Sequence, residues 1–567
     1  MRTARAHFKL ALRECRLEED RLRTEALARK LTDNDAVGFW NDVKKINPRP
    51  LKLTNTLDRV TGESDILSLW YDKYSKLYNS VDANANHDEL LHLEGNYEFV
   101  TVETLIRCLD QLPKGKSAGV DGVPAEVLQG GSHRLRVLLA MFINACLCHC
   151  WLPPMLMRTI LIPLIKDRLK PASDSDNYRL IAIASSFSKL FELIILSRCE
   201  NLLHTTDNQF GFKKKHGTDL CIYLLKDVIN YYNVKGSPVY CCFLDLRKAF
   251  DRVNFKKLFQ KLINRNVPPY IVKLLVFWYT NQEMAVRWGN LVSTTFKVTN
   301  GLRQGGILSP GLFNVYVDLL SENLNGTRIG CYAGSMLINH LSYADDMVLL
   351  APSAQALRRL LKTCEEYAKD YSIIYNTDKT KCMICWPKSS VGEPVFALQG
   401  VSLELVQNFK YLGVIISTNM TDDAELTKKT RGIYASGNSM ISSFKSCSTV
   451  CKTAVFRTYM SSIYCIALWC SYSVRSYAKA KVAHNDILRS LFRVPRYASA
   501  SALFVHHNLK NLDVIRRNAM YNLMTRLLAS PNSLVRAVCR SEVRVQSRIW
   551  HHWSVSLGLE WNTIMAL

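Results

Sequence analysis

The stretch HLSYADDMVLLA, residues 340–351, sets two neighbouring aspartates between two apolar runs. Apolar runs on both sides of a short polar interruption predict two short strands joined by a turn. Asp345 and Asp346 would then lie together at that turn, although adjacent carboxylates repel each other when both are ionised. An Asp–Asp pair also favours turns for purely structural reasons. A chemical role therefore depends on which other residues the fold brings to this turn.

A third aspartate stands at the end of another apolar segment. In SPVYCCFLDL, residues 237–246, the apolar run predicts a strand, and Asp245 follows it where the sequence becomes charged. A strand ending in Asp, beside a hairpin tipped with Asp–Asp, would hold three carboxylates on rigid supports. Two divalent cations roughly 4 Å apart need such carboxylates, and they promote in-line phosphoryl transfer. Three aspartates suit Mg²⁺, which keeps water and phosphate oxygens among its ligands, with Mn²⁺ as a substitute.

Strand-like and helix-like segments alternate through the middle of the chain. RTILIPLIKD, residues 158–167, predicts a strand, and SSFSKLFELIILSRCENLL, residues 185–203, predicts an amphipathic helix. LSPGLFNVYVDLL, residues 308–320, predicts a helix with Pro310 in its first turn. These patterns indicate a mixed α/β region of about 300 residues, followed from about residue 422 by mainly helical, basic sequence.

Five segments follow one another in the order of the palm motifs of reverse transcriptases, and they most resemble those of non-LTR (LINE-type) retrotransposons. They are FLDLRKAFDRV, GLRQGGILSPGLFNVY, LSYADDMVLL, YNTDKTKCMI and VQNFKYLGVIIS. Four upstream segments resemble that group's fingers: LPKGKSAGVDGVPAEVL, ILIPLIKD, DNYRLIAIASSFSKLFE and NQFGFKKKHGTD. The resemblance covers residues 102–417, with a looser thumb-like match to about residue 528. Each segment alone is weak, but the ordered series is specific.

The resemblance implies an α+β, right-hand polymerase fold with fingers, a palm built on an antiparallel sheet, and a helical thumb. Six regions are expected along the chain. They are a charged helical N-terminal segment (1–50), ended by Pro48 and Pro50, a linker (51–100), fingers (101–240), palm (241–420), a basic helical thumb (421–530) and a C-terminal tail (531–567).

The resemblance also implies roles for the acidic residues and for the aromatic residue that follows the first of them. Asp245 and Asp345 would be the metal ligands proper, and Asp346 would be the third carboxylate, closest to the primer end. Phe250 would wall off the 2′ face of the incoming sugar and so favour dNTPs over rNTPs. An ordinary core position is the alternative for Phe250.

Residues expected to contact the incoming nucleotide come from three motifs. Gln304 and Gly305 would lie beside the nascent base pair, and Arg179 would grip the triphosphate with Lys166, for which a surface lysine is an equal alternative. Lys379 would protonate the departing pyrophosphate, with a solvated lysine as its alternative.

Two further features of the motifs qualify the resemblance. The family usually has proline after the arginine of the NYRLI segment, and Leu180 in its place is expected to loosen a turn there. Phe409, Tyr411, Leu412 and Gly413 resemble the hairpin that grips the primer.

The charge of the chain points to polyanionic partners. The net charge is +24 and the isoelectric point is about 9.3. Residues 421–567 carry 20 basic and 7 acidic residues, and residues 431–510 carry 11 basic residues against the single acid Asp486. A solvated basic surface is the plain alternative, but an excess this concentrated favours nucleic acid. RNA template, DNA primer, RNA–DNA hybrid and dNTPs are the partners that the resemblance implies, whereas protein partners stay open.

Several other classes are disfavoured. The N-terminus has no apolar signal segment, so the 18 scattered cysteines are expected to be reduced thiols of an intracellular protein, nuclear or cytoplasmic. The C-x2-C pair Cys382 and Cys385 has no second pair nearby, which argues against zinc. No apolar run is long enough to span a membrane, and TYMSSIYCIALWCSYSV, residues 458–474, predicts a buried helix.

Three functional hypotheses remain from the residues. The first is an RNA-directed DNA polymerase, and the second is an inactive nucleic-acid-binding remnant with a polymerase fold. The third, an RNA-copying RNA polymerase, is disfavoured by Phe250 and by Tyr-Ala-Asp-Asp in place of Gly-Asp-Asp. No endonuclease or ribonuclease H motif is recognised, so we expect a polymerase cut from a longer retrotransposon polyprotein, with an endonuclease supplied in trans left open.

Overall fold

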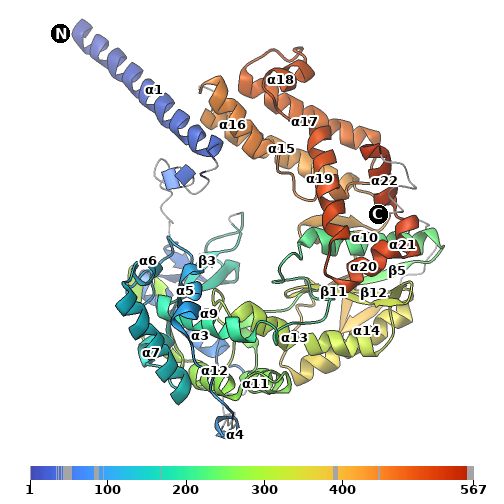
Figure 1. The fold of residues 1–567 in the computed structure, drawn as a ribbon. Helices are drawn as coiled ribbons and strands as arrows, with labels where there is room; N and C mark the ends of the chain where they lie inside the picture. Colours follow the sequence, from blue (N-terminus) through green and yellow to red (C-terminus); the bar gives the residue numbers. More distant parts are fainter. Residues whose placement is uncertain are drawn as a thin grey trace.

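The computed structural model describes residues 2–33, 35, 38–39, 41–42, 54–81, 88–92, 95–167, 169–386, 394–444 and 447–558. Figure 1 shows two mixed α/β parts, built mainly from the first 420 residues, with the last helices standing over one of them. Five clusters of buried apolar side chains hold these parts together.

The first sheet contains the predicted strand of residues 158–167. Its strand order is β4-β3-β6-β7, with β8 paired to β6, and β3 pairs with β4 antiparallel and with β6 parallel. The strands are β3 (Arg158–Ile165), β4 (Tyr178–Ala184), β6 (Glu283–Trp288), β7 (Leu291–Val292) and β8 (Phe296–Lys297). Because β6 comes from residues 283–288, this sheet combines strands from two regions that were expected to be separate, the fingers and the palm.

Helices that precede β3 in the sequence and helices that follow β4 pack into one hydrophobic core. That core includes the predicted amphipathic helix, which the structure gives as α9 (Ser186–Cys199). The other helices that contribute to it are α3 (Glu63–Leu77), α5 (Val102–Asp110), α6 (Ala125–Gln129), α7 (His133–His149), α8 (Pro154–Met157), α11 (Phe255–Asn264), α12 (Pro269–Asn281) and α13 (Ser309–Gly326).

The expected linker of residues 51–100 is in part a core element. The short hairpin β1 (Thr56–Leu57) and β2 (Val60–Thr61) leads into α3, whose Trp70 is fully buried and lies 5.9 Å from the Trp288 ring. An aromatic residue of this size stabilises a fold strongly when it is buried. The polar composition around residues 79–95 obscured this helix, and α4 (Asp88–Leu91) is the next described element.

The second sheet has the strand order β11-β12-β5-β13-β15-β14 and contains both aspartate segments. All pairs along it are antiparallel except β13–β15, so the expected antiparallel sheet is mixed at that edge. The hairpin prediction for residues 340–351 is confirmed. The strands are β5 (Val239–Leu244), β11 (His340–Tyr343), β12 (Asp346–Ala351), β13 (Lys381–Cys385), β14 (Phe396–Leu398) and β15 (Val401–Leu405).

Helices cover both faces of this sheet, and alternate residues of β5 explain how. Cys241 and Phe243 belong to the cluster that contains α10 (Thr218–Val234). Tyr240 and Cys242 belong to the cluster that contains α13 (Ser309–Gly326) and α14 (Ala354–Asp370). Since successive side chains of a strand point to opposite faces, a strand buried on both sides reads as one apolar run.

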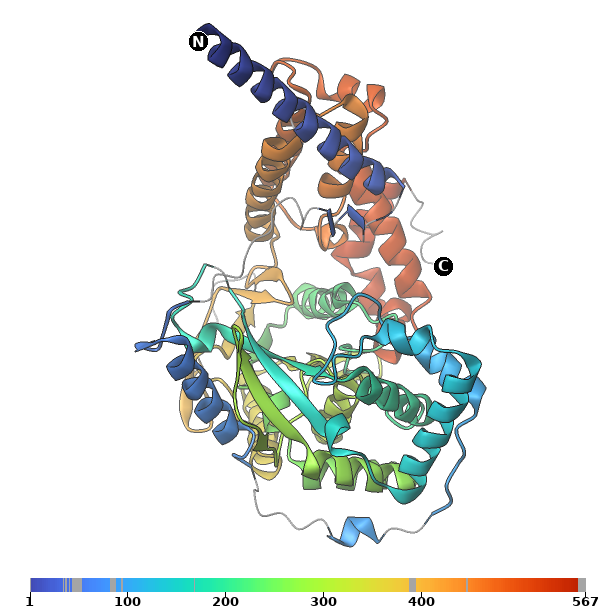
Figure 2. The ribbon, with the colours of Figure 1, turned by 90° about the vertical axis from the view of Figure 1, so that its left-hand side faces the viewer.

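The C-terminal part is helical, as predicted, with a short hairpin before it. Figures 1 and 2 both show its helices of residues 423–506, in orange, above α10. Its elements are β16 (Asn408–Tyr411), β17 (Val414–Ser417), α15 (Asp423–Phe444), α16 (Thr449–Met460), η3 (Ile466–Leu468), α17 (Val474–Phe492), α18 (Ala500–His506), α19 (Leu512–Leu528), α20 (Ser533–Arg540), α21 (Glu542–Val545) and α22 (Arg548–Leu557). A further small hairpin joins β9 (Cys331–Ala333) to β10 (Met336–Ile338).

Two expectations for this part are wrong. Residues 458–474 do not form one buried helix: α16 ends at Met460, and the chain continues as a loop with Cys465 at φ +58° and the short η3. The expected tail from residue 531 instead packs α20–α22 on α10, with Trp550 and Trp553 fully buried. The structure of both segments depends on burial against residues that are distant in the sequence. No local sequence pattern encodes such burial.

The N-terminal helix α1 (Arg2–Thr32) forms the first part of the charged segment predicted to be helical, and residues 38–39 and 41–42 are helical as well. Leu27, in its last two turns, is buried together with residues of α16 and α17. Pro48 and Pro50 lie outside the described residues. Among the helices that the structure describes, none combines the length and the apolar composition that crossing a lipid bilayer requires. All the cysteines are free thiols.

A buried ion pair joins helix α10, which packs on the second sheet, to Asp422, the residue directly before α15. Lys226 Nζ lies 2.6 Å from Asp422 Oδ1, and their side chains are 5% and 3% exposed. Lys226 also donates to the Leu468 carbonyl, while Asp422 accepts from the backbone N–H groups of Cys470 and Ser471. The charges are therefore paired and hydrogen-bonded, which is the condition under which a buried ion pair is tolerated.

Replacing Lys226 tests this junction. Lys226→Met should lower the free energy of unfolding by about 3–5 kcal/mol, because Asp422 would stay buried without its counter-ion. Denaturant unfolding followed by circular dichroism measures the change. The matched control is Lys214→Met, which breaks the pair with Glu200 whose side chains are 88% and 57% exposed, and should cost less than about 1 kcal/mol. Equal losses in the two variants would contradict a structural role for the buried pair.

Candidate active site

Strand pairing brings the three aspartates together. Met347 of β12 faces Leu244 of β5 in the antiparallel register, so Asp346 continues that register opposite Asp245. Asp345 occupies the turn between β11 and β12. The Asp245 backbone is held on its other side, where its N–H donates to Thr380 Oγ1 and its carbonyl accepts from the Asn376 N–H. The tips of three strands therefore converge on one acidic cluster.

Burial and neighbouring carboxylates raise the pKa of Asp345 and of Asp346. Burial, and then the charge of Asp245, raise the pKa of Asp345, while Arg179 acts in the opposite direction. Burial, with repulsion from Asp345 and Asp245, raises the pKa of Asp346 to about 6, although the Asp346 side chain still reaches solvent. The cluster is thus an electrostatic site that favours a cation.

Carboxylate oxygens are the type of ligand that hard divalent cations bind. Among the described residues, no group of three or more His, Cys, Asp or Glu side chains is arranged so that it could hold a metal ion by itself. Open carboxylates that repel each other match a metal that binds one or two protein carboxylates and completes its shell with water and phosphate oxygens. The nearest basic side chain to Asp245 is Lys379, whose Nζ lies 3.9 Å from Oδ2 at the edge of ion-pair range. The carboxylate of Asp245 is therefore only weakly compensated by the protein itself.

A cleft of about 930 Å³ gathers the predicted site residues from both sheets. All the predicted positions line it except Asp346, which adjoins it beside Asp345. Those that line it are Lys166, Arg179, Asp245, Phe250, Gln304, Gly305, Asp345 and Lys379. Residues separated by more than 200 positions in the sequence thus share one cavity, as their motif order implied.

Basic side chains line the same cleft as the aspartates. Lys166 directly follows β3, and Arg179 lies on the neighbouring strand β4. The antiparallel register of these two strands places both residues at the same end of the first sheet. Burial, then the charges of Lys379 and Arg179, lower the pKa of Lys166. Repulsion between these neighbouring cationic side chains indicates a pocket that binds a polyanion. Lys248 also lines this cleft; it was missed as a separate site residue, although it lies inside the FLDLRKAFDRV motif.

Phe250 is held rigidly by two other aromatic rings. Its ring stacks on Phe313 at 4.3 Å between centroids and meets the edge of Phe212 at 6.1 Å. The short helix η2 (Phe250–Arg252) turns the next side chain, Asp251, away into the protein, where burial raises its pKa. Phe250 lines the cleft and packs in the core at the same time, so the two alternatives for this residue are compatible.

Asp251 also holds Gln304, a link that the motifs did not reveal. Gln304 Nε2 donates to Asp251 Oδ1 at 3.1 Å, and Tyr78 Oη donates to the same oxygen at 2.8 Å. Tyr78 comes from the segment after α3, which the sequence assigned to a linker. The position of Gln304 in the cleft therefore depends on a buried carboxylate one residue after Phe250.

The loop of residues 301–306 sits directly on β4. The Ala182 N–H donates to the Gln304 carbonyl at 2.8 Å. Gly305 has φ +119°, and a Cβ there would lie 3.0 Å from the Ala182 carbonyl oxygen. Arg303 anchors the loop from below through a fully buried ion pair with Glu192. Glycine is needed at residue 305 because both its dihedral angle and the close strand exclude a side chain.

The expectation for Leu180 is wrong. Residues 178–184 form the strand β4, and Leu180 is buried opposite Pro163 of β3. The structure has no turn at this place that a missing proline could loosen. The residue instead contributes an apolar side chain to the core beneath Arg179.

The hairpin of β16 and β17 lies beside the second sheet. Phe409 stacks on Phe243 of β5 at 4.3 Å between centroids. At its turn, Leu412 has φ +43° and Gly413 has φ +84°. The carbonyl of Leu412 accepts from Tyr464 Oη, and that of Gly413 accepts from Lys428 Nζ. The C-terminal part of the chain therefore clamps this turn.

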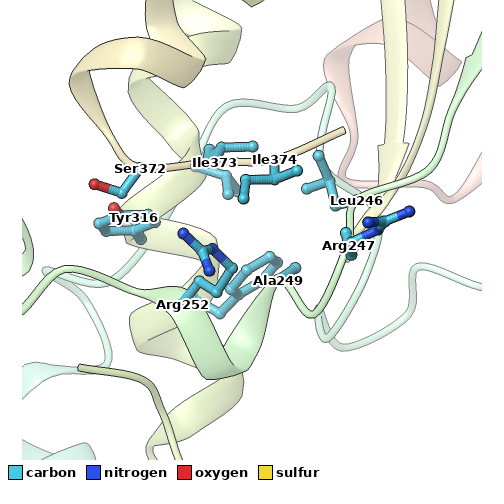
Figure 3. A pocket seen from close by; sticks show the side chains of 10 residues that line it. Leu246, Arg247, Ala249, Arg252, Tyr316, Ser372, Ile373 and Ile374 are labelled. Atoms are coloured by element: carbon cyan, nitrogen blue, oxygen red, sulfur yellow. The ribbon is translucent and has the colours of Figure 1, made fainter. Parts of the chain in front are cut away.

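A small cavity lies behind the segment that joins Asp245 to Phe250. Figure 3 shows Leu246 and Ala249 facing Ile373 and Ile374 across it, with Arg252 and Tyr316 at one end. Its volume of about 10 Å³ is room for about one water molecule. Leu246, Arg247 and Ala249 line both this cavity and the large cleft, so the segment forms a thin wall between them.

Known proteins share the sequence that builds this cleft. A family profile described as reverse transcriptase (RNA-dependent DNA polymerase) matches residues 168–416. Residues 168–416 are therefore similar to reverse transcriptase domains. The match spans Arg179 and all three aspartates, and it confirms the resemblance of the motifs to this family.

Similar full-length proteins come from insect transposons. The probable RNA-directed DNA polymerase from transposon BS of Drosophila melanogaster is 28% identical over 446 residues, 75% of this chain and 48% of that protein. The RNA-directed DNA polymerase from mobile element jockey of Drosophila funebris is 24% identical, covering 77% and 49%. The Pol polyprotein from the type-1 retrotransposable element R2 of Popillia japonica is 28% identical, covering 47% and 38%. The chain thus spans about half the length of the BS and jockey relatives.

Substituting Gly305 tests the packing of its loop against β4. Under the polymerase function proposed below, Gly305→Ala should reduce the rate of primer extension by about 10²-fold, because the new methyl group displaces Gln304 from its place in the cleft by a fraction of an ångström or more. Single-turnover extension assays measure the rate. Gly326→Ala is the control, since a Cβ at that helix end meets no atom within 4 Å. An unimpaired Gly305→Ala enzyme would show that the close approach to Ala182 has no bearing on activity.

Proposed function

We propose that this protein is an RNA-directed DNA polymerase of a non-LTR retrotransposon, which extends the 3′-hydroxyl of a primer with dNTPs. One observation carries the proposal: Asp245 and Asp345, with Asp346 adjoining them, share one cleft with the basic side chains of Lys166 and Arg179. A polyanionic triphosphate bound by the basic side chains would present its α-phosphate to the carboxylates. The reverse transcriptase match, which covers Arg179 and the three aspartates, supports the same reading.

In this proposal the parts of the chain take the roles of a right-handed polymerase. The first sheet and its helices, centred on residues 101–240, are the fingers, and the second sheet, within residues 241–420, is the palm. The helices of residues 421–530 are the thumb. Their basic surface and the clamped β16–β17 hairpin would follow the backbone of an RNA–DNA hybrid, which is recognised by shape and phosphate rather than by sequence.

The side chains around the cleft divide the work of nucleotide transfer. Mg²⁺ held by the three aspartates would supply activation of the 3′-hydroxyl and charge stabilisation on the phosphates. Lys166 and Arg179 bind and orient the triphosphate, and Lys379, placed 3.9 Å from Asp245, gives a proton to the departing pyrophosphate. The Phe250 ring, fixed by Phe212 and Phe313, packs against the sugar where a 2′-hydroxyl would project.

The inactive-remnant hypothesis finds less support. The aspartates, the basic side chains and Phe250 share one cavity, and the Leu180 substitution leaves β4 a regular strand. A role inside the cell, in the nucleus or the cytoplasm, belongs to this proposal as well and accords with the free thiols.

Removing one carboxylate tests the proposed chemistry. Asp345→Asn should reduce dTTP incorporation on a poly(rA) template with an oligo(dT) primer and Mg²⁺ by about 10³-fold or more, because preorganised charge at the reacting phosphate is lost. Binding of the hybrid, measured by fluorescence anisotropy, should change by less than about twofold. Asp110→Asn, on the exposed end of α5, is the control and should be fully active. Normal incorporation by Asp345→Asn would refute the assignment of this cluster.

Shortening the Phe250 side chain tests the sugar gate. Phe250→Ala should lower the preference for dTTP over UTP by about tenfold or more, because the ring that excludes the 2′-hydroxyl is gone. Competition assays with both nucleotides give the ratio of kcat/KM values. Phe142→Ala, on the outer face of α7, controls for loss of an aromatic ring elsewhere in the fold. A preference that stays at the wild-type value would leave Phe250 with a packing role alone.

A further inference from the structure

A segment outside the catalytic motifs lies along the aspartate hairpin. Residues 208–212, between α9 and α10, run beside β11, which is the edge strand of the second sheet. The Ser342 N–H donates to the Asn208 carbonyl, and the Phe210 N–H donates to the Ser342 carbonyl, both at 2.8 Å. Asn208 Nδ2 also donates to the His340 carbonyl at 2.9 Å. The segment therefore completes the edge of the sheet where the turn with Asp345 begins.

Gln209 binds the backbone of the turn with both ends of its side-chain amide. Its Oε1 accepts from the Ala344 N–H at 2.9 Å, and its Nε2 donates to the Ala344 carbonyl at 3.2 Å. The same Oε1 accepts from the Gly211 N–H at 2.8 Å, so the amide is fixed from its own segment too. Gln209 is 2% exposed. In a buried setting, these bonds are stronger than their counterparts in water.

The backbone conformation of Ala344 sets the direction in which Asp345 and Asp346 leave the turn. This residue stands between Tyr343 and Asp345 with φ +58°, a left-handed conformation that disfavours residues with a Cβ. Both of its backbone polar groups are satisfied by Gln209 alone among the described hydrogen bonds. Without that amide, the turn would lose the contacts that offset its strained backbone, and other turn conformations would direct Asp345 and Asp346 differently.

The rest of the segment makes the fit tight. A Cβ on Gly211 would lie 2.2 Å from the Ala344 nitrogen, so no side chain can be placed there without moving the turn. Asn314 of α13 donates to the Gly211 carbonyl, and Phe212 meets the edge of Phe250. The segment thus touches the aspartate turn on one side and the aromatic wall of the cleft on the other.

We propose that Gln209 is a positioning residue for nucleotide transfer, which holds Asp345 and Asp346 in register with Asp245 through the Ala344 backbone. The inference rests on the proposed polymerase function. Gln209 does not line the cleft, so it acts on the aspartates and not on the substrate. Displacement of reacting groups by about 1 Å costs about 10²-fold in rate, and Mg²⁺ demands near-ideal ligand geometry.

The test compares two nearly isosteric substitutions with a matched control. Gln209→Met removes both hydrogen bonds to Ala344, and Gln209→Glu keeps the acceptor but loses the donor. Gln129→Met is the control, because Gln129 likewise donates to two backbone carbonyls, those of Leu109 and Leu112, in the helices away from the cleft. Each purified variant is assayed by single-turnover extension on poly(rA)·oligo(dT), by anisotropy with the same hybrid, and by thermal melting.

The expected result is a loss of rate without a loss of binding. For Gln209→Met, kcat should fall by about 10–10²-fold, the KM for dTTP and the hybrid Kd should stay within about twofold, and the half-saturating Mg²⁺ concentration should rise. Gln209→Glu should fall between that variant and wild type. In the metal-free protein, amide hydrogen exchange of residues 341–346 should be faster in Gln209→Met and unchanged in Gln129→Met.

Other outcomes would overturn the inference. Wild-type kcat in either folded Gln209 variant would show that the turn keeps its geometry unaided. Equal losses of rate and melting temperature in Gln209→Met and Gln129→Met, or an unfolded Gln209→Met together with a fully active Gln209→Glu, would reduce Gln209 to general stability. If wild type itself fails to incorporate dTTP, the proposed polymerase function fails instead, and that result is distinguishable from these.

Discussion

The antiparallel pairing of β12 with β5 is the constraint on which the rest of the structure depends. Its register sets Met347 opposite Leu244, and it therefore brings Asp346 across from Asp245 at the ends of two strands from different parts of the chain. A slip of one residue would turn the apolar side chains of β12 to the wrong faces and move the carboxylates apart. Cores on both faces of the sheet penalise such a slip, because β5 and β12 are buried by α10 on one side and by α13 and α14 on the other.

Electrostatic repulsion is concentrated at this rigid place, and Arg179 and Lys379 offset part of it. The pKa of Asp345 and of Asp346 rises through burial and through neighbouring carboxylates, while the pKa of Lys166 falls through burial and neighbouring cations. Groups of like charge gathered at one cleft are costly when the cleft is empty, but they suit a substrate that carries phosphates together with divalent cations.

Contacts between distant segments hold the site residues, through the backbone of Ala344 and through the side chain of Gln304. Gln209 binds Ala344, Asp251 binds Gln304, and the C-terminal residues Tyr464 and Lys428 bind the turn of the β16–β17 hairpin. Each contact joins segments separated by tens to hundreds of positions. The precision of the cleft thus comes from residues that carry no recognisable chemistry themselves, in accord with the requirement that reacting groups be held in place by a supporting shell.

The sequence by itself determined the strands, the hairpin and the identity of the residues that meet in the cleft. Apolar runs that end in Asp245, or that flank Asp345 and Asp346, are local patterns, and the order of the motifs carried the rest by resemblance to reverse transcriptases. Tertiary structure alone decided that residues 63–77 and 531–558 are core, that residues 458–474 break into a loop, that Leu180 lies in a strand, and that Gln209 braces the turn. These outcomes depend on burial and hydrogen bonds between distant segments, which no periodicity or composition within a short window encodes.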